Sequence, residues 1–394
     1  MASEHTELSK VQQRADIPHA NRIVVKIGSS SLSDIQGGLN TQAVIDLVDA
    51  LGEVIRRGNQ VVLVSSGAIA AGLAPMGLTS RPKDLATQQA AAAVGQVVLA
   101  AQYSKEFGRY GETAAQVLLT ADDLIRRGHY ANAFRSLSRL LSLGIVPIVN
   151  ENDAVATSEI RFGDNDRLAA LVANLVKADA LVLLSDVDAV YTAHPERGGE
   201  PIDTVTHPSD LADVELGSAG SAGVGTGGMQ TKVAAATIAA QSGIPTLVTS
   251  AANASKALAG EDVGTFFAAQ RGRRSLKRLW LEHLAEGRGR LVLDDGAVKA
   301  IASGTNSLLA AGIIDVRGEF IEGEPVDITN SNGVVIARGF SSFASDEIPD
   351  MLGLTSDQLR EDLGDRFERP VVHADELAVF GSVFAKANPD AINS

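Results

Sequence analysis

The chain has 394 residues, of which 45% are hydrophobic and 21% charged, and this length predicts two or three domains of roughly 150 residues each. The formal net charge of −14 argues against non-specific nucleic-acid binding by the chain as a whole. The absence of cysteine excludes disulfides, thiolate metal sites and a cysteine nucleophile.

Residues 1–20 are polar and lack the apolar segment of a secretory signal, so we expect a flexible arm there. No apolar run reaches the roughly 20 residues that are needed to cross a bilayer. We therefore expect a cytoplasmic protein that does not enter a membrane.

Residues 21–270 alternate short β-branched runs with longer runs rich in Ala and Leu. The predicted strands are Ile23–Ile27, Gln60–Ser65, Thr113–Leu118, Ile145–Val149, Ala180–Ser185 and Pro245–Val248. The predicted helices are Thr41–Arg57, Leu85–Phe107, Tyr130–Leu143, Asn165–Lys177 and Met229–Gln241. Because the strands are apolar at nearly every position, both of their faces should be covered. The pattern predicts an α/β catalytic domain, a three-layer sandwich with a largely parallel central sheet.

The composition changes after residue 270. Residues 271–288 form a predicted basic linker, which contains the cluster Arg271–Arg278 and the sole tryptophan, Trp280. In residues 289–375, short apolar runs are separated by turns of Gly, Asn and Asp, which predicts a small, mostly β barrel. Its predicted strands are Arg290–Leu293, Ile313–Arg317, Pro325–Ile328 and Val334–Arg338. Residues 376–394 are predicted to be a tail.

Lys26 stands near the end of a predicted buried strand and is followed by Gly28 and three serines. A lysine within an apolar strand is costly unless its charge is paired. A turn of Gly and Ser presents backbone N–H groups, which can bind phosphate oxygens. The alternative is a lysine at the sheet edge whose ammonium group reaches water, and this segment alone favours neither interpretation.

A second strand runs into the small residues of Ser65–Gly72. Backbone donors where a helix begins suit an anion. Two such turns after parallel strands would face the same crevice, where ligands of open α/β sheets bind. Taken alone, a helix cap by Ser65 or Ser66 explains this segment better.

The third glycine-rich element is Gly223–Lys232. Gly223, Gly225 and Gly228 have the spacing of a dinucleotide-binding loop, but no strand precedes them and no suitably placed acidic residue follows. Lys232 is neither preceded by Gly nor followed by Ser or Thr, which excludes a P-loop. A flexible loop that opens a helix could still place Lys232 on a transferring phosphoryl group. The alternative is a linker of small residues.

The polar segment Asn150–Thr157, followed by Gly163–Asp166, comes directly after a predicted strand. Its amides and carboxylates could bind an ammonium group, a carboxylate and a metal together. Ser185 and Asp186 end another buried strand, where an adenine and its ribose could lie, although an ordinary turn explains that pair alone. Phosphoryl transfer depends on positioning and charge neutralisation. The two lysines, the acids and the glycine turns therefore predict a small-molecule kinase that acts on an amino acid.

In this order the motifs resemble the amino acid kinase superfamily and, within it, the glutamate 5-kinases, from about residue 21 to about residue 375. The motifs are Val25–Ser30, Ser65–Gly72, Asn150–Thr157, Gly163–Asp166 and Gly225–Lys232. The second region is similar to a PUA domain in the segments Gly304–Leu309, Gly312–Ile313, Gly318–Phe320 and Gly323. The resemblance implies ATP-dependent phosphorylation of the γ-carboxylate of L-glutamate, the first step of proline biosynthesis.

The resemblance also implies the roles of single residues. Lys26 and Lys232 would stabilise the transferring phosphoryl group, and Asp166 would hold both lysines in position. Glutamate would be bound by Ser66, Gly67, Asn150, Asp153 and Asn165. ATP would contact Lys26, Ser185, Asp186, Thr226, Gly227, Gly228, Met229, Gln230, Thr231 and Lys232. Mg²⁺ would be held mainly through the ATP phosphates.

Other functions remain as alternatives. N-acetylglutamate kinase is disfavoured because an acylated amine could not pair with Asp153, and aspartokinase because its regulatory domains are usually of the ACT type; uridylate kinase is a further rival. RNA binding by the PUA-like region is the alternative from another class, with Arg271–Arg278 and Trp280 as its footprint, but the net charge favours a solvated linker. By resemblance we also expect proline as a feedback inhibitor, near residues 156–163, and a homo-oligomer, either a dimer or a tetramer.

Overall fold

The computed structural model describes residues 11–33, 38–120, 123–124, 127–155, 165–212, 214, 228–270, 281 and 287–380. The chain forms two compact units, Met1–Arg274 and Ser275–Ser394, and each is described by itself. The finer division of the chain into an arm, a catalytic domain, a linker, a β domain and a tail stays a prediction. Among the helices of the described residues, none is long and apolar enough to span a membrane.

The first unit is built on an eight-stranded sheet with the order β3-β4-β2-β1-β5-β7-β8-β6. Its strands are β1 (Arg22–Ile27), β2 (Gln60–Ser65), β3 (Thr113–Leu119), β4 (Ile145–Glu151), β5 (Ala180–Ser185), β6 (Thr204–Val205), β7 (Thr246–Ser250) and β8 (Thr265–Phe267). Neighbouring strands are parallel except for β7 and β8. The largely parallel sheet that the sequence predicts is therefore confirmed.

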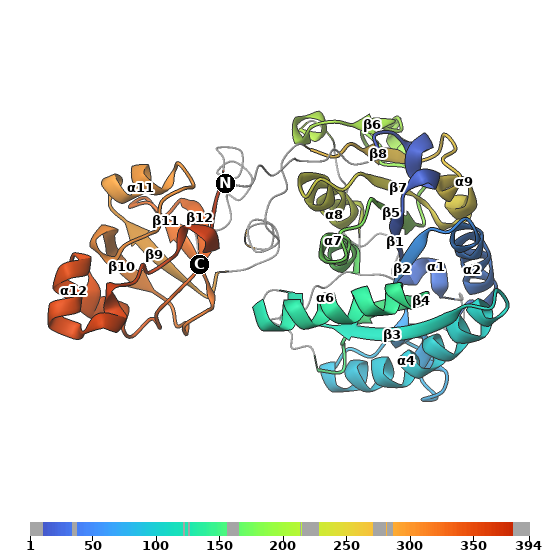
Figure 1. Ribbon diagram of the computed structural model, residues 1–394, viewed down its shortest axis with the longest axis horizontal. Helices are drawn as coiled ribbons and strands as arrows, with labels where there is room; N and C mark the ends of the chain where they lie inside the picture. Colours follow the sequence, from blue (N-terminus) through green and yellow to red (C-terminus); the bar gives the residue numbers. More distant parts are fainter. Residues whose placement is uncertain are drawn as a thin grey trace. The chain divides into compact units, whose positions relative to one another are not determined.

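Helices cover both faces of this sheet, as Figure 1 shows. The helices α7 and α8 lie on one face, while α2 and α9 lie on the other. The helices of this unit are α1 (Ser29–Leu32), α2 (Thr41–Arg56), α3 (Ala68–Leu73), α4 (Leu85–Gly108), α6 (Arg127–Ser142), α7 (Asn165–Leu175), α8 (Met229–Gln241) and α9 (Ala254–Leu258). Its short 3-10 helices are η1 (Arg14–His19), η2 (Pro195–Arg197), η3 (Pro208–Leu211) and η4 (Ala251–Asn253). This layering confirms the predicted sandwich.

The alternation of side chains along β1 decides where its lysine points. Ile23, Val25 and Ile27 belong to the same core cluster as the apolar residues of α2. Successive side chains of a strand point to opposite faces. Lys26 therefore points to the other face of the sheet, which α7 covers.

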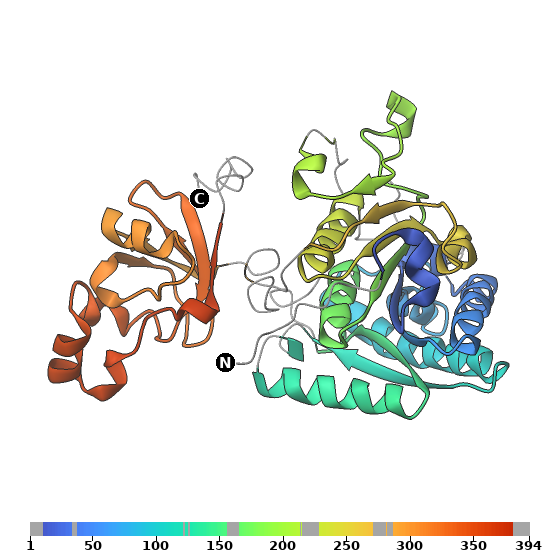
Figure 2. The ribbon, with the colours of Figure 1, turned by 45° about the horizontal axis from the view of Figure 1, so that its top comes forward.

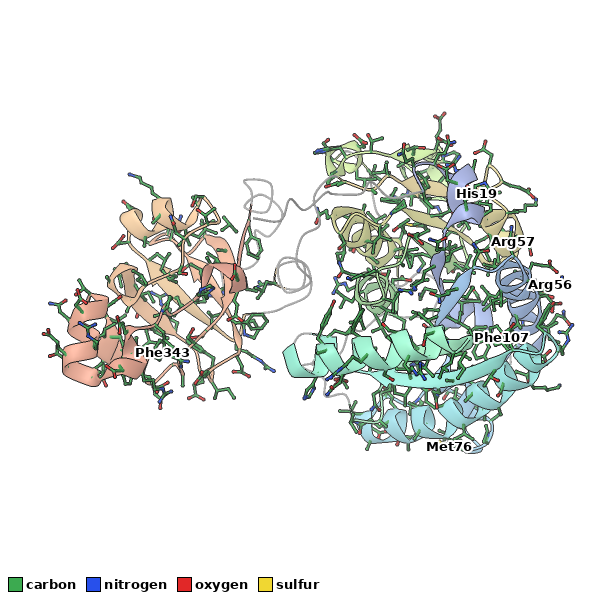
Figure 3. The ribbon with its side chains drawn as sticks, in the orientation of Figure 1. His19, Arg56, Arg57, Met76, Phe107 and Phe343 are labelled. Atoms are coloured by element: carbon green, nitrogen blue, oxygen red, sulfur yellow. The ribbon has the colours of Figure 1, made fainter. Side chains whose placement is uncertain are left out.

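The helices α3 and α4 approach each other unusually closely. A Cβ atom on Gly72 of α3 would overlap the carbonyl oxygen of Ala91, and one on Gly95 of α4 would overlap that of Ala68. The side chain of Phe107, labelled in Figure 3, is buried in the core cluster near the end of α4. The two glycines thus place the beginning of α3 directly against a long helix that is anchored in the core.

The N-terminal residues differ from the flexible arm that the sequence predicts. Residues 11–20 include the 3-10 helix η1, which contacts α9 (Figure 2). Val11, Ile17 and Ala20 are buried in the core cluster. Arg14 forms ion pairs with Asp203 and Asp262. The few apolar residues of this segment are too irregularly spaced to show a helix or a strand in the sequence, and their burial depends on contacts with residues far along the chain. Residues 1–10 lie outside the described part.

The second unit contains a five-stranded sheet with the order β10-β9-β11-β12-β13. The pair β9 and β11 is parallel, and the other pairs are antiparallel. Its elements are β9 (Gly289–Leu293), α11 (Asp295–Ile301), η5 (Ala310–Gly312), β10 (Ile313–Arg317), β11 (Pro325–Thr329), β12 (Val335–Phe340), η6 (Ile348–Met351), α12 (Ser356–Leu363), η7 (Asp365–Glu368), η8 (Ala374–Glu376) and β13 (Leu377–Val379).

A separate hydrophobic core holds this second unit together, and Phe343 of that core is labelled in Figure 3. The ring of Phe343 stacks on Phe367 with 5.6 Å between the centroids. These features confirm a small, mostly β unit. One difference concerns the predicted tail, because β13 pairs with β12 and so residues 377–379 belong to the sheet.

Candidate functional site

The ends of four neighbouring strands meet at one edge of the large sheet. Ile27, at the end of β1, is paired with Ser65 on β2 and with Leu184 on β5, and Val64 on β2 is paired with Val149 on β4. In an open α/β sheet this edge, at the carboxyl ends of the strands, is where ligands bind. Most of the predicted site residues lie at these four strand ends or in the first turns of α7 and α8.

A buried cluster of two lysines and one carboxylate lies behind this edge. Asp166, in the first turn of α7, forms ion pairs with Lys26 through Oδ1 and with Lys232 through Oδ2, the second with an Nζ–Oδ2 distance of 3.1 Å. The exposed fractions are 0% for Asp166, 2% for Lys26 and 5% for Lys232. The hydroxyl of Thr231 lies 3.3 Å from Oδ2 of Asp166 and is 2.7 Å from the carbonyl oxygen of Gly228, to which it donates. The cluster is held by three separate elements, β1, α7 and α8.

Two ammonium groups share the one carboxylate of Asp166. The cluster formed by Lys26, Asp166 and Lys232 has a formal charge of +1. In a site that excludes water, such a charge acts far more strongly on a bound anion than it would in bulk solvent. The arrangement is therefore suited to an anionic group whose negative charge grows during a reaction.

The amide of Asn165 connects three elements beside this cluster. Its Nδ2 group donates to the carbonyl oxygen of Ser65 and to the hydroxyl of Ser66, both over 3.0 Å, and to Oδ1 of Asn150 over 2.8 Å. Oδ1 of Asn150 also accepts from the backbone N–H of Glu151. Since the carbonyl oxygen of Ser65 and Oδ1 of Asn150 can only accept, the orientation of this amide is fixed. Its Oδ1 is buried and has no hydrogen-bond partner within the described residues.

The turn after β2 has a backbone conformation that favours glycine. Gly67 has a φ angle of +94°, in the left-handed region, where a side chain would add strain. The backbone N–H of Ser66 donates to the carbonyl oxygen of Ile27 over 3.2 Å, which ties the turn to the end of β1. Ser66 and Gly67 thus lie at the same edge as the lysine cluster.

The remaining predicted residues lie around the same edge or outside the described part. Ser185, at the end of β5, donates to the carboxylate of Asp186 over 2.9 Å. Asp153 follows β4 and is half-buried. The residues of the predicted nucleotide loop that are described begin α8 as its N-cap and first turn: Gly228, Met229, Gln230, Thr231 and Lys232. Thr226 and Gly227 lie outside the described residues. The described residues of this set lie at or just after strand ends or at the start of α8, while the role of each stays a prediction.

Within the described residues, no group of three or more His, Asp or Glu side chains could hold a metal ion. The carboxylate of Asp166 is already bound by Lys26 and Lys232.

Two residues of this region were not singled out in the sequence. The hydroxyl of Tyr103, on α4, lies 2.9 Å from the hydroxyl of Ser65 at the end of β2. Gln96, also on α4, accepts a hydrogen bond from Gln116 on β3. No sequence signal could have identified them, because each occupies an inward-facing position of a helix that otherwise packs as ordinary core.

Two family models match the chain, the amino acid kinase family over residues 21–250 and the PUA domain over residues 289–363. A glutamate 5-kinase of Thermobifida fusca is 57% identical over 370 residues, which cover 93% of this chain and 95% of that protein. A glutamate 5-kinase of Streptomyces coelicolor is 56% identical over 368 residues, which cover 93% of this chain and 98% of that protein. Among solved structures, carbamate kinase from Giardia lamblia bound to AMP-PNP is 19% identical with a TM-score of 0.47, over 64% of this chain and 100% of that one.

Proposed function

Since this chain belongs to the amino acid kinase family and, within it, to the glutamate 5-kinases, we propose that Lys26, Asp166 and Lys232 form the centre at which it phosphorylates L-glutamate. The enzyme transfers the γ-phosphoryl group of ATP to the γ-carboxylate of L-glutamate. The product is L-glutamyl 5-phosphate, and the reaction is the first step of proline biosynthesis. The observation that carries the proposed site is the buried cluster in which two ammonium groups share one carboxylate.

The chemistry requires no general base. An oxygen of the γ-carboxylate, which is already ionised at neutral pH, attacks the γ-phosphorus of ATP. A new P–O bond forms as the bond to the β,γ-bridging oxygen breaks, and the electron pair leaves with ADP. Negative charge accumulates on the transferring group and on the leaving oxygen. Lys26 and Lys232 are the groups that neutralise this charge, and Asp166 keeps both ammonium groups at fixed positions.

Asn165 and Asp153 are the groups that we assign to the amino acid. The buried Oδ1 of Asn165 has no partner within the described residues, and the α-ammonium group of glutamate is a donor that would satisfy it. Asp153 supplies the negative charge that a desolvated ammonium group requires. Ser66, Gly67 and Asn150 complete the set that binds glutamate. N-acetylglutamate, which lacks the ammonium group, is disfavoured on this basis.

The nucleotide is assigned to the neighbouring strand end and to the start of α8. Ser185 ends β5 and Asp186 follows it, and β5 is the neighbour of β1, which carries Lys26. In the first turn of α8, the backbone N–H groups and the positive end of the helix dipole favour phosphate. Mg²⁺ is proposed to be held mainly by the ATP phosphates.

The test is a hydroxamate assay with the purified chain, ATP, Mg²⁺ and hydroxylamine, because hydroxylamine traps an acyl phosphate as a hydroxamate. L-Glutamate, N-acetylglutamate and L-aspartate are compared at equal concentrations. Hydroxamate formed with L-glutamate, and little with the other two, is the expected result. Faster turnover of N-acetylglutamate, or no hydroxamate at all from a folded chain that binds ATP, would contradict the proposal.

We further propose a cytoplasmic homo-oligomer, a dimer or a tetramer, in which proline inhibits by competing with glutamate. Inhibition by proline should be strongest at low glutamate, and light scattering of the purified chain should give a mass of at least two chains.

RNA is not the partner that we propose for the second unit. Residues 287–380 contain 17 Asp and Glu residues and only eight Lys and Arg residues, an excess of nine negative charges. Such a surface repels the phosphate backbone. Titration of a labelled RNA should therefore show no binding at physiological salt.

A further inference from the structure

Ser65, the last residue of β2, takes part in two hydrogen bonds that its position in the sheet does not explain. Its hydroxyl lies 2.9 Å from the hydroxyl of Tyr103, which stands on α4, and it donates to the carbonyl oxygen of Ser66 over 3.1 Å. Tyr103 is 0% exposed and Ser65 is 1% exposed. A buried chain of two hydroxyl groups therefore leads from α4 to the turn that contains Ser66 and Gly67.

The donor in each of these two hydrogen bonds follows from the number of protons on the hydroxyl groups. A serine hydroxyl carries a single proton, and that of Ser65 is donated to Ser66. Tyr103 must therefore be the donor in the bond between the two hydroxyls. Burial raises the pKa of the Tyr103 phenol well above its ordinary value, so this proton stays in place across the physiological range. Hydrogen bonds in series polarise and strengthen one another.

The last bond of the chain fixes the plane of the peptide between Ser66 and Gly67. In a trans peptide the N–H points away from the preceding C=O. Holding the carbonyl of Ser66 against Ser65 therefore turns the N–H of Gly67 in the opposite direction. From another side, Asn165 donates to the carbonyl oxygen of Ser65 and to the hydroxyl of Ser66. The turn is thus held by α4 and by α7 together.

We infer that Tyr103 and Ser65 are positioning residues for glutamate. They fix the peptide that presents the N–H of Gly67 and the hydroxyl of Ser66 to the substrate, and they do so without touching the substrate themselves. This inference rests on the proposed function, in which Ser66 and Gly67 bind glutamate. The inference adds α4 to the site, a helix that carries none of the residues assigned to the site above.

The hydroxyl of Tyr103 is not needed for packing. Leu99, Tyr103 and Phe107 follow one another at a spacing of four on α4, and all three lie in the hydrophobic core cluster. A phenylalanine in the middle position would fill nearly the same space. A hydroxyl buried in an apolar core destabilises the fold unless it is hydrogen-bonded. The bond to Ser65 is therefore the specific feature that tyrosine adds here.

The experiment measures kinetics and melting temperature for Tyr103→Phe, Ser65→Ala and the double variant. Tyr110→Phe is the matched control, because Tyr110 also bonds through its hydroxyl, to Asp49 over 2.8 Å, at the end of α4 remote from the strand ends. Tyr103→Phe and Ser65→Ala should each raise KM for glutamate about three- to tenfold, the range expected for the loss of one hydrogen bond, with KM for ATP unchanged. Tyr110→Phe should lower the melting temperature alone.

The double variant shows whether Tyr103 acts through Ser65. If it does, the double variant should have the same KM for glutamate as Ser65→Ala, because Ser65→Ala alone already breaks the hydrogen-bonded connection between Tyr103 and the turn. An unchanged KM for glutamate in both single variants, with a lower melting temperature, would overturn the inference and leave only a structural bond. Multiplied effects in the double variant would also overturn it. Wild-type turnover of glutamate is measured in the same assay, so failure of the proposed function would appear in the wild type itself.

Discussion

Asp166 and Lys232 lie 66 positions apart in the sequence, and yet their side chains meet with 3.1 Å between Oδ2 and Nζ. The other oxygen of the same carboxylate pairs with Lys26, so a single side chain sets the separation of two ammonium groups. A buried charge pair contributes little to stability when compared with a well-packed apolar alternative. The cluster is therefore explained better by its chemistry than by its contribution to folding.

The first prediction concerns Lys232→Ala. This ammonium group stabilises the transition state of phosphoryl transfer more than it stabilises bound glutamate. Its removal should therefore lower kcat about 100- to 1000-fold, while KM for glutamate changes little. Lys256→Ala, which removes an exposed lysine of α9, is the control and should keep normal kcat. The measurement is steady-state kinetics with both substrates varied, which gives kcat and KM for each variant. Near-normal turnover of Lys232→Ala would show that its assigned role is wrong.

The second prediction concerns Asp166→Asn, which keeps the shape of the side chain and removes its charge. Two buried ammonium groups would then lose the carboxylate that both of them share, so both kcat and the melting temperature should fall. Asp327→Asn is the control, because it breaks a partly buried ion pair with Arg338 in the second unit. It should lower stability and leave kcat unchanged. Equal losses of kcat in the two variants would contradict a role specific to Asp166.

The third prediction concerns Asn165→Asp. In the wild type, Nδ2 donates to three acceptors, on Ser65, Ser66 and Asn150. A carboxylate there cannot donate, and it would face three oxygens, so the turn after β2 should shift. We expect KM for glutamate to rise at least about tenfold, with a smaller change in KM for ATP. A variant whose KM for glutamate stayed normal would remove Asn165 from the substrate site.

Several elements could be predicted from the sequence, and the reasons are physical. The predicted bounds of β2, β5 and α8 agree with the structure residue by residue, because apolar runs and glycine turns delimit them clearly. The strands β6, with two residues, and β8, with three, are too short for any periodicity to show.

The residues of the site also fall into those that the sequence predicts and those that it does not. Its motifs were recognised because they are contiguous in the sequence. The partnership of Tyr103 with Ser65 spans 38 positions, and the spacing of Tyr103 on α4 is simply that of a core residue. Such contacts depend on how helices pack on the sheet, which a single sequence does not show.

The fourth prediction uses two glycines of one helix. Gly95→Ala would push a Cβ atom into the carbonyl of Ala68, so α3 and α4 must separate, at a cost of about 1–3 kcal/mol in the free energy of unfolding. Gly108, at the end of α4, has nothing within 4 Å of the position of a Cβ atom. Gly108→Ala should therefore stabilise the protein, by up to about 1 kcal/mol. Denaturant unfolding of both variants is the measurement, and a stabilised Gly95→Ala would contradict the close crossing.

The last prediction concerns the attachment of the N-terminal segment and its dependence on pH. Arg14 donates a hydrogen bond to Asp203 over 2.7 Å. This bond, together with one from Thr204, lowers the pKa of Asp203 below its ordinary value. A carboxyl group with a lowered pKa in the folded state contributes stability above the pKa of the unfolded chain, about 3.9, and that contribution is lost as the pH falls through the folded value.

Arg14→Ala should therefore lower the melting temperature at pH 7 by about 1–3 °C, since ion pairs near the surface are weak. The difference from the wild type should shrink as the pH falls below about 4, because Asp203 is then increasingly protonated in both proteins. Arg56→Ala breaks the exposed pair with Glu53 and serves as the control, with almost no change at either pH. Thermal melts from pH 7 to pH 3 provide the comparison. A difference between Arg14→Ala and the wild type that stayed constant over this range would show that Arg14 acts through its hydrogen bonds to the backbone carbonyl oxygens of Asp203 and Gly264 instead of through the carboxylate of Asp203.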